Sequence, residues 1–515
     1  MTSSSELSSA VGKLIVGRVA GPELDDLSAN LLKTGTMGGV TLFKDNARNL
    51  QQLINLCDAI TNAGGSECLL TVDQEGGAVQ RFDHVISPIP SMMALAALNN
   101  PEMVRTAIEI SGEQLRLLGI QCVLAPVLDL ATNRQNPIIS TRAFSDDPDL
   151  VSELALLVAQ TYKKFGVLPI GKHFPGHGDT LEDSHSSLAV AKADLETLRK
   201  RDLVPFMRSA RHMPGMLTGH LWVQALEKES VPASLSTKIT GDLLRGEMRY
   251  DGLVMTDDLP VMRAIVDHYG LEDAAVKAIL AGNDLLLVSG TYDQIRSVHG
   301  ALMKAVDEGV ITQERLQESL GRRAFFMDYF RGRFDLHKKD RDSRIDRLKQ
   351  SIEFGKMFLA EYSARAMCLL RGDLPDWDAD IGQWVVLYPD HPRYQFNLQP
   401  HFDKFLGMTA QHIAYSVNPD ENEVSGLVEK CTGKDCILMT FRAMINQGQL
   451  QLGHEVARTA KYRLVVATEA PFELSELSDW DNALAVLDPS DHAMEALSLV
   501  LARKVRPSGT LPVSI

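Results

Sequence analysis

Short apolar runs alternate with longer amphipathic stretches from the N-terminus to residue 290. The stretch 49–64, for example, places apolar residues three and four apart, which is the period of a helix. The short runs are apolar at nearly every position, which is typical of parallel strands covered by helices on both faces. The eight strand candidates are 13–20, 38–43, 68–73, 121–130, 167–174, 215–222, 251–258 and 283–290.

Eight strand–helix units within about 300 residues predict an α/β fold that begins with a (β/α)8 TIM-type barrel. A doubly wound open sheet is the alternative, and eight parallel strands favour the closed barrel. A second series of apolar runs predicts a smaller doubly wound α/β sandwich domain after the barrel. Its strand candidates are 383–390, 412–417, 435–441, 463–468 and 483–488, followed by a helix over 492–504 and a terminal segment over 508–515.

The charge pattern suggests where these parts meet. Residues 331–365 alternate Asp with Arg and then become helical, which indicates a solvated connecting segment. We therefore expect a catalytic barrel over 1–330, a helical linker over 331–365 and a C-terminal α/β sandwich domain over 366–515.

Composition limits the classes of function. The chain has 515 residues, of which 45% are hydrophobic and 23% charged, as in soluble globular proteins. A net charge of −15 opposes nonspecific nucleic-acid binding, and six cysteines are too few for a disulfide scaffold. No apolar run approaches the roughly 18 residues of a membrane helix, and the N-terminus lacks the pattern of a signal peptide. We expect a cytoplasmic protein with neither membrane nor nucleic-acid partners.

Polar and charged residues gather where the predicted barrel strands end. A barrel builds its active site at the carboxyl ends of its strands. One such residue could simply cap the following helix, but the same pattern at five strands favours an active site. The residues are Asp73, Asp129, Lys172, His173, His220 and Asp257.

The segment KHFPGHGDTLEDSH over 172–185 is the densest polar cluster of the chain, and it follows the fifth predicted strand. Its Gly and Pro residues impose an irregular loop. Asp183 and His185 could form an acid–base pair, in which the carboxylate fixes the tautomer of the imidazole. The polar groups could instead hold the shape of the loop, or they could bind zinc. The candidate zinc ligands are His173, His177, Asp179, Asp183 and His185.

The segment GLVMTDDL over 252–259 ends a buried strand in two adjacent carboxylates. Because successive strand side chains point to opposite faces, one carboxylate can face the site while the other faces away. An inward Asp257 opposite an acid–base loop suits glycoside hydrolysis, in which one carboxylate attacks the sugar and a second group transfers the proton. We interpret Asp258 as the N-cap of the next helix.

The segment LLTVDQEGGAVQRF over 69–82 supplies a third cluster. It contains neither GxGxxG nor GxxxxGK[ST], so its glycine pair is weak evidence for phosphate binding. A buried Asp73 is better suited to accept hydrogen bonds from sugar hydroxyls. Arg81, Arg142 and Lys172 could donate others, although each of them alone is more typical of a surface or structural charge.

These stretches together resemble family 3 glycoside hydrolases, specifically the two-domain form of the β-N-acetylglucosaminidase branch. KHFPGHGDTLEDSH is similar to the signature of that branch, and DQEGG, the segment NPI…RAFSDDP and the strand-end DD are similar to it as well. The terminal PSGTLPVSI resembles the closing strand of two-domain members. The resemblance covers most of the chain and is most specific over 172–185.

The resemblance implies a role for each matching residue. Asp257 matches the catalytic nucleophile, and His185, paired with Asp183, matches an acid/base dyad carried on a loop. No metal or other cofactor is implied, which favours the acid–base interpretation of that loop. The residues that match the groups holding the non-reducing sugar are Asp73, Arg81, Arg142, Lys172 and His173.

Two positions depart from the pattern of the branch. Ala78 stands where an Arg is common, so we expect one contact of the sugar site or its loop to be missing. After DDL, the run PVMRAI is one residue longer than the usual form, which leaves the start of the following helix undefined.

The sequence therefore predicts an exo-acting retaining β-N-acetylglucosaminidase that removes terminal GlcNAc through a covalent glycosyl-enzyme. We expect a small saccharide substrate, either a cell-wall fragment or a chitin-type disaccharide, and a monomer or homodimer. A phosphorylase with the same residues stays open as an alternative, as does a metal-dependent hydrolase, which we favour less. The C-terminal domain shows no comparable cluster of candidate residues.

Overall fold

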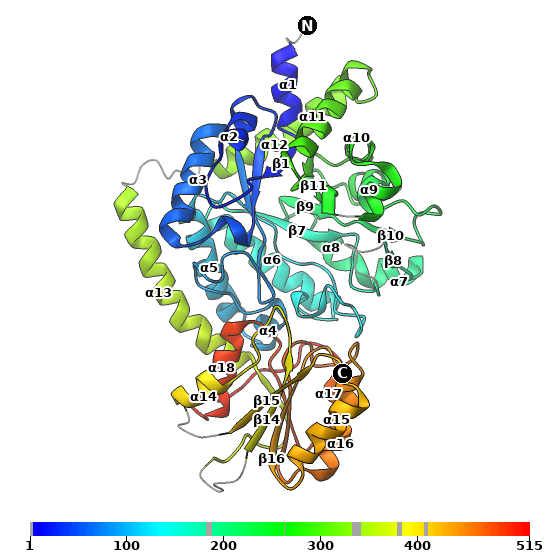
Figure 1. The fold of residues 1–515 in the computed structure, drawn as a ribbon. Coiled ribbons are helices and arrows are strands. Elements are labelled where there is room, and N and C mark those ends of the chain that lie inside the picture. The colour runs from blue at the N-terminus through cyan, green and yellow to red at the C-terminus, as the bar shows by residue number, and fades with distance from the viewer. Residues whose placement is uncertain (1–3, 182–187, 262, 332–340, 378–383, 406–409) are drawn as a thin grey trace.

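The computed structural model of the chain contains a closed barrel and a separate six-stranded sheet (Figure 1). It describes residues 4–181, 188–261, 263–331, 341–377, 384–405 and 410–515. We call the two parts the barrel domain and the sheet domain. The long helix α13 (Arg341–Ala366) runs beside both of them (Figure 1). It packs against α5 (Pro101–Leu118) of the barrel domain and α18 (Asp491–Leu501) of the sheet domain.

Eight parallel strands close the barrel in the order β1-β12-β11-β9-β7-β6-β3-β2. Each strand lies within one of the eight predicted runs, so the predicted (β/α)8 barrel is confirmed. The strands are β1 (Ile15–Arg18), β2 (Gly39–Leu42), β3 (Leu69–Val72), β6 (Cys122–Val123), β7 (Leu168–Phe174), β9 (Gly215–Thr218), β11 (Leu253–Asp258) and β12 (Leu285–Leu287).

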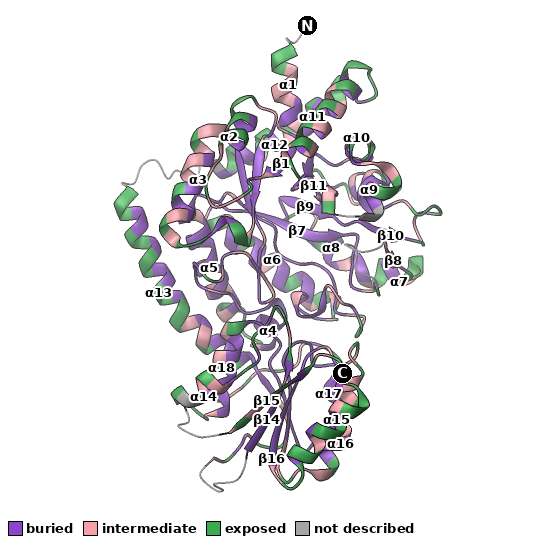
Figure 2. Cartoon of the chain, in the orientation of Figure 1, coloured by how far each residue is buried: buried purple, intermediate pink, exposed green. Residues whose placement is uncertain are grey.

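Most helices of this domain surround the barrel, with their buried faces turned inward (Figures 1 and 2). In α5, Asn100 accepts hydrogen bonds from the first turn, and Gly119 ends the helix in the left-handed conformation with φ of 91°. The helices are α1 (Ser4–Gly12), α2 (Asp26–Lys33), α3 (Leu50–Gly64), α4 (Met92–Ala97), α5 (Pro101–Leu118), α6 (Pro148–Lys164), α7 (Leu195–Thr197), α8 (Val204–Ser209), α9 (Arg263–Tyr269), α10 (Leu271–Ala281), α11 (Tyr292–Asp307) and α12 (Gln313–Arg331).

Helix α12 closes the barrel at the amino-terminal ends of the strands. Its Arg315 and Arg322 pair with Asp284, which directly precedes β12 and whose side chain is fully buried. Arg245 pairs with the same carboxylate. Met327 and Phe330 of α12 pack with apolar side chains of the barrel strands. One buried carboxylate thus joins α12 to the barrel.

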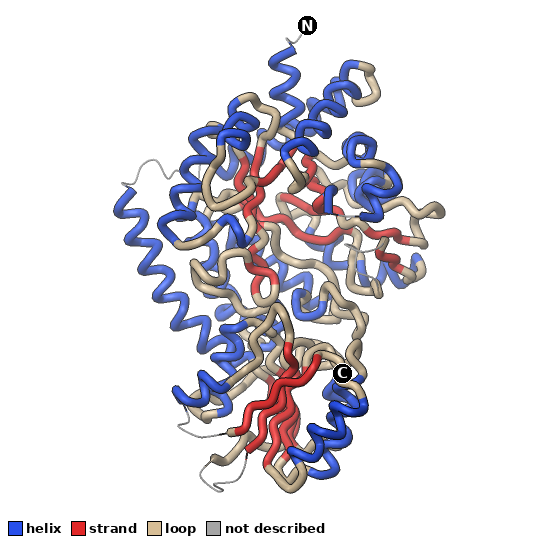
Figure 3. Tube along the Cα trace, in the orientation of Figure 1, coloured by secondary structure: helices blue, strands red, loops and turns tan. Residues whose placement is uncertain are grey.

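The sheet domain has the strand order β13-β18-β17-β16-β14-β15, with β13 antiparallel at one edge (Figure 3). The five predicted strands are confirmed, whereas β13 was not predicted. The strands are β13 (Cys368–Arg371), β14 (Trp384–Asp390), β15 (Gln411–Ser416), β16 (Asp435–Thr440), β17 (Arg463–Ala467) and β18 (Asn482–Ala485), and the helices are α14 (Gln399–Phe405), α15 (Glu421–Cys431), α16 (Gly448–Thr459), α17 (Glu473–Glu476) and α18 (Asp491–Leu501).

Both faces of this sheet are covered, as a doubly wound domain requires. Along β16, Leu438 packs with Leu452 of α16 on one face. The neighbouring Ile437 points to the other face, where it packs with Leu497 of α18. The strands are therefore apolar at nearly every position, which is the pattern that predicted them.

The last eight residues form no strand, so the predicted closing strand is wrong. The backbone of Gly509 donates to Met367, beside β13, and that of Thr510 donates to Ala97 of the barrel domain. Ser514 donates to Asp146, which lies in the loop after β6. The segment connects the two domains because its backbone bonds are divided between them.

No helix in the described part of the chain is long and apolar enough to span a membrane.

We predict that Asp284→Asn lowers the free energy of unfolding by about 3 kcal/mol, because it leaves three arginines around a neutral amide. Guanidinium unfolding of both proteins measures the change. The matched control is Asp251→Asn, since Asp251 pairs with Arg322 at 3.0 Å but is 89% exposed. This control substitution should lower the free energy of unfolding by less than about 0.5 kcal/mol. Similar small losses in both variants would contradict the role given to Asp284.

Candidate active site

A cavity of about 460 Å³ lies at the carboxyl ends of the barrel strands, and the sheet domain forms one of its walls. It brings together six of the eight predicted site residues. The other two, Asp183 and His185, lie outside the residues that the structure describes. The six are Asp73, Arg81, Arg142, Lys172, His173 and Asp257.

Asp73 follows β3 directly and accepts from two cations. Lys172, on β7, donates to one of its oxygens at 2.7 Å, and Arg81 donates to the other at 2.9 Å. Burial would raise the pKa of Asp73, but the two cations hold it well below its usual range. The carboxylate is therefore ionised, and both of its oxygens are oriented.

Glu75, on β4 (Gln74–Gly76), is the centre of the cluster, and its side chain is fully buried. Its carboxylate lies 2.5 Å from the ammonium of Lys172. Arg142, in the loop after β6, donates to both oxygens of Glu75 at 2.8 and 2.9 Å. Glu75 was not among the site residues predicted from the sequence. The signal that could have found it is its place in DQEGG, the segment that resembles the family, two positions after Asp73.

His173 links this network to Asp129. The Nη2 of Arg142 lies 3.2 Å from Nε2 of His173, and a guanidinium can only donate, so Nε2 accepts. The proton of His173 is then on Nδ1, which donates to Asp129 at 2.6 Å. Asp129 also accepts from the backbone of His177 at 2.7 Å. The tautomer of His173 is thus fixed from both sides.

His177 begins the polar loop after β7 and is buried. Its Nδ1 lies 2.7 Å from the hydroxyl of Thr180. Burial lowers the pKa of His177 to about 4, against a partial opposing effect of Asp129, so the ring is neutral at neutral pH. His177 and Thr180 anchor the described start of the loop that carries the predicted acid–base pair.

The residues considered as zinc ligands are engaged elsewhere where the structure describes them. Asp179 pairs with Arg201 at 3.1 Å, pointing to a surface helix. Among the described residues, no three His, Cys, Asp or Glu side chains are close enough to hold a metal ion.

Asp257 and Asp258 at the end of β11 interact with different partners, because successive side chains of a strand point to opposite faces. Burial would raise the pKa of Asp257, but the N–H of Asp258 and the ammonium of Lys172 are among the groups that lower it. Asp257 lines the cavity as a carboxylate. Burial raises the pKa of Asp258 to about 6.

Asp258 is not the helix cap that the sequence analysis proposed. Its carboxylate accepts from the backbone and the hydroxyl of Ser289, beyond β12. The chain after Asp258 forms a short turn, η6 (Leu259–Val261), before α9, and Met262 between them lies outside the described residues.

The sheet domain contributes the opposite wall, with residues that were not predicted from the sequence. Arg442 forms a two-pronged ion pair with the buried Glu469. It also donates to the carbonyl oxygen of Pro137 at 2.8 Å, in the loop that carries Arg142. The remaining lining residues from this domain are His391, Arg393, Tyr394 and Phe441. The position of Arg142 therefore depends on both domains.

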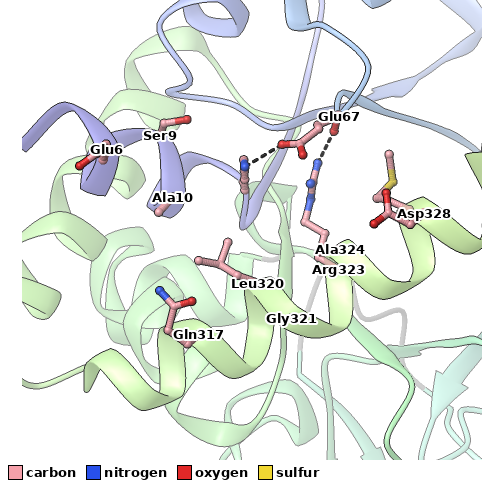
Figure 4. Close-up of a pocket in the computed structure, with 12 residues that line it drawn as sticks. Glu6, Ser9, Ala10, Glu67, Gln317, Leu320, Gly321, Arg323, Ala324 and Asp328 are labelled. Carbon is pink, nitrogen blue, oxygen red and sulfur yellow. Dashed lines mark hydrogen bonds and ion pairs between the residues drawn. The ribbon is translucent and has the colours of Figure 1, made fainter. Parts of the chain in front are cut away.

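A second cavity, of about 500 Å³, lies at the opposite end of the barrel (Figure 4). Lys13 and Glu67, which precede β1 and β3, form an ion pair of 2.6 Å in its wall, and Arg323 of α12 donates to the carbonyl oxygen of Glu67. These contacts join strand starts to α12, at the end of a barrel that is usually devoted to stability. None of the predicted site residues lines this cavity.

Comparison with known proteins decides the family. The family model described as the glycosyl hydrolase family 3 N-terminal domain matches residues 7–324. The chain belongs to glycosyl hydrolase family 3. This assignment confirms the family that the sequence resembles and the glycoside hydrolase class.

Several relatives of this family 3 chain are known. It is 31% identical to β-hexosaminidase A of Pseudoalteromonas piscicida over 328 residues, which are 58% of this chain and 54% of that protein. The match thus spans about half the length of that relative. The chain is 35% identical to a β-hexosaminidase of Alkalilimnicola ehrlichii over 319 residues, which are 61% of this chain and 89% of the relative.

A solved structure resembles the whole chain. It is a family 3 β-N-acetylglucosaminidase from a Paenibacillus species, with a TM-score of 0.86 and 29% identity. The superposition covers 99% of this chain and 98% of that one, so the arrangement of barrel and sheet domain is shared.

We predict that His177 makes the stability of this family 3 protein sensitive to acid. Its folded pKa of about 4 lies below the ordinary 6.5, so the unfolded state takes up the proton first as the pH falls. When the pH falls from 7.5 to 5, the low pKa of His177 should therefore lower the free energy of unfolding of the protein by roughly 2 kcal/mol. Urea unfolding of wild type and His177→Asn at both pH values tests this. The Asn oxygen can still accept from Thr180, so the variant should lose less stability than wild type; equal losses would contradict the prediction.

Proposed function

We propose that this chain is an exo-acting β-N-acetylglucosaminidase that releases terminal GlcNAc with retention of configuration. The observation that carries the proposal is an ionised carboxylate, Asp257, in the same cavity as a preorganised set of hydroxyl-binding groups. The names of the relatives, hexosaminidases and an N-acetylglucosaminidase, support GlcNAc as the sugar.

Asp257 is proposed as the nucleophile. A nucleophilic carboxylate has to be ionised in the cavity, and the lowered pKa of Asp257 meets this requirement. Its attack on the anomeric carbon breaks the glycosidic bond and forms a covalent glycosyl-enzyme, which water then hydrolyses.

The network beside Asp257 is proposed to hold the sugar. Sugar hydroxyls both donate and accept hydrogen bonds, and the network offers carboxylate oxygens that accept as well as cationic groups that donate. Its members are Asp73, Arg81, Arg142, Lys172 and His173. Because each of these side chains is already held by an ion pair or hydrogen bond, little freedom is lost when the sugar binds. Val79 and Ile138 add apolar surface that suits the methyl group of an acetamide.

The proton transfers are assigned to His185, oriented by Asp183. This assignment rests on the resemblance of 172–185 to the family signature. His185 would protonate the leaving oxygen and then take a proton from water in the second step. An imidazole has an ordinary pKa near neutral pH, so it can serve as both acid and base.

The domain limits are proposed as a catalytic barrel over 1–330, a connecting segment over 331–365 and a C-terminal domain over 366–515. The ion pair of Arg442 with Glu469 and the contact of Arg442 with Pro137 support a role for the third part in shaping the catalytic cavity.

Replacing Asp257 by Asn tests the function. We expect kcat/KM on 4-nitrophenyl β-N-acetylglucosaminide to fall at least about 1,000-fold, on the order of 4 kcal/mol, because the covalent route is lost. The matched control is Asp258→Asn, which removes the neighbouring carboxylate that binds Ser289 and should cost less than about tenfold. Assays with and without phosphate distinguish free GlcNAc from GlcNAc 1-phosphate as the product. A loss of under tenfold in Asp257→Asn would exclude Asp257 as the nucleophile.

A further inference from the structure

Arg393 lies in the loop after β14 and reaches from the sheet domain to the mouth of the active-site cavity. Its Nη2 donates to the carbonyl oxygen of Ala78 at 2.8 Å, on the hairpin that follows β3. Its guanidinium lies 5.3 Å from the centre of the Tyr394 ring. One hydrogen bond across the domain boundary and one ring contact therefore orient a side chain that is otherwise exposed.

The charge of Arg393 is not balanced, unlike that of the other cations in the cavity. Arg81 and Lys172 pair with Asp73, Arg142 pairs with Glu75, and Arg442 pairs with Glu469. Among the described residues, no carboxylate forms an ion pair with Arg393. The cavity thus ends in a positive charge on the sheet-domain side.

His391 beside it does not change this balance, because the ring is neutral. Its Nδ1 accepts from the backbone of Arg393 at 3.1 Å and of Tyr394 at 3.3 Å. Burial lowers the pKa of His391, and Arg442 and Arg393 lower it further. With Nδ1 accepting, the ring proton is on Nε2, which leaves a neutral donor next to the cation.

Arg393 contacts one of the two positions at which the sequence departs from the pattern of the branch. Ala78 stands where we expected a missing contact, and its carbonyl oxygen is the acceptor for Arg393. The cation that contacts this hairpin comes from the sheet domain, more than 300 residues away in the chain.

We propose that Arg393 binds an oxyanion on the leaving-group side of the cavity. The inference rests on the proposed function, in which the sugar occupies the barrel-side network and the rest of the substrate extends toward the opposite wall. A guanidinium has five N–H donors in a rigid fork that matches carboxylate and phosphate oxygens. One donor is used by Ala78, which fixes the fork and leaves the others for a ligand. The oxyanion is either a carboxylate of the aglycone or free phosphate.

Two matched substrates test the carboxylate. 4-Carboxyphenyl and 4-carbamoylphenyl β-N-acetylglucosaminide have similar shapes and differ in charge. In wild type, kcat/KM should be at least about tenfold higher for the charged substrate. Arg393→Met should remove this preference and its dependence on salt, while changing the neutral substrate less than threefold. The matched control is Arg503→Met, because Arg503 also donates from the surface of the sheet domain to a carbonyl oxygen, that of Leu374, but does not line the cavity.

Phosphate titration tests the other source. If free phosphate is the ligand, it should accelerate cleavage of the neutral substrate and yield GlcNAc 1-phosphate. Arg393→Met should then raise the KM for phosphate at least about tenfold, and Arg503→Met should not. Either pattern supports the oxyanion site and identifies its occupant.

Two outcomes would overturn the inference. If Arg393→Met affects both substrates equally, or neither, and leaves the phosphate response unchanged, Arg393 has only a structural role. Wild type would still cleave the neutral substrate in that case, so the proposed function would stand. If wild type cleaves neither substrate, the proposed function fails and the oxyanion site fails with it.

Discussion

A carboxylate that is buried away from water needs cationic partners inside the protein to offset the cost of its desolvation. Glu75 is such a carboxylate, at the active-site end of the barrel. Its side chain has no exposed surface, and its partners are Lys172 and Arg142. Lys172 is shared with Asp73, and Arg142 is shared with His173. Each group that we propose to contact the sugar is therefore placed by its charge partners, and a change in one of them displaces the others.

The same constraint extends into the sheet domain. Arg442 is compensated by the buried Glu469, and the pair holds the loop of Arg142 through Pro137. The C-terminal segment holds the same loop through Asp146. We infer that the sheet domain is part of the catalytic cavity and also a platform for the loop of Arg142. This arrangement explains why Arg393 can face the same space as Asp257 although the two belong to different domains.

The barrel and Asp257 could be predicted because local patterns encode them: apolar strands, and polar residues where these strands end. Glu75 could not, because its importance comes from partners 67 and 97 positions away in the chain, and sequence spacing does not reveal ion pairs. The sheet-domain residues were missed for a different reason. His391, Phe441 and Glu469 follow β14, β16 and β17, so the strand-end rule would have selected them had it been applied to the second sheet. The prediction of a closing strand was wrong because the backbone hydrogen bonds of residues 508–515 are divided between two domains.

The central claim is that Glu75, which touches no proposed reacting atom, organises the sugar-binding groups. Calorimetric titration of N-acetylglucosamine into wild type and Glu75→Gln tests it most directly, because the amide keeps the shape of the side chain and removes its charge. We predict that the Kd rises at least about 30-fold, roughly 2 kcal/mol, as Lys172 and Arg142 lose a shared partner. An unchanged Kd, within about threefold of wild type, in a variant that remains folded would contradict the account.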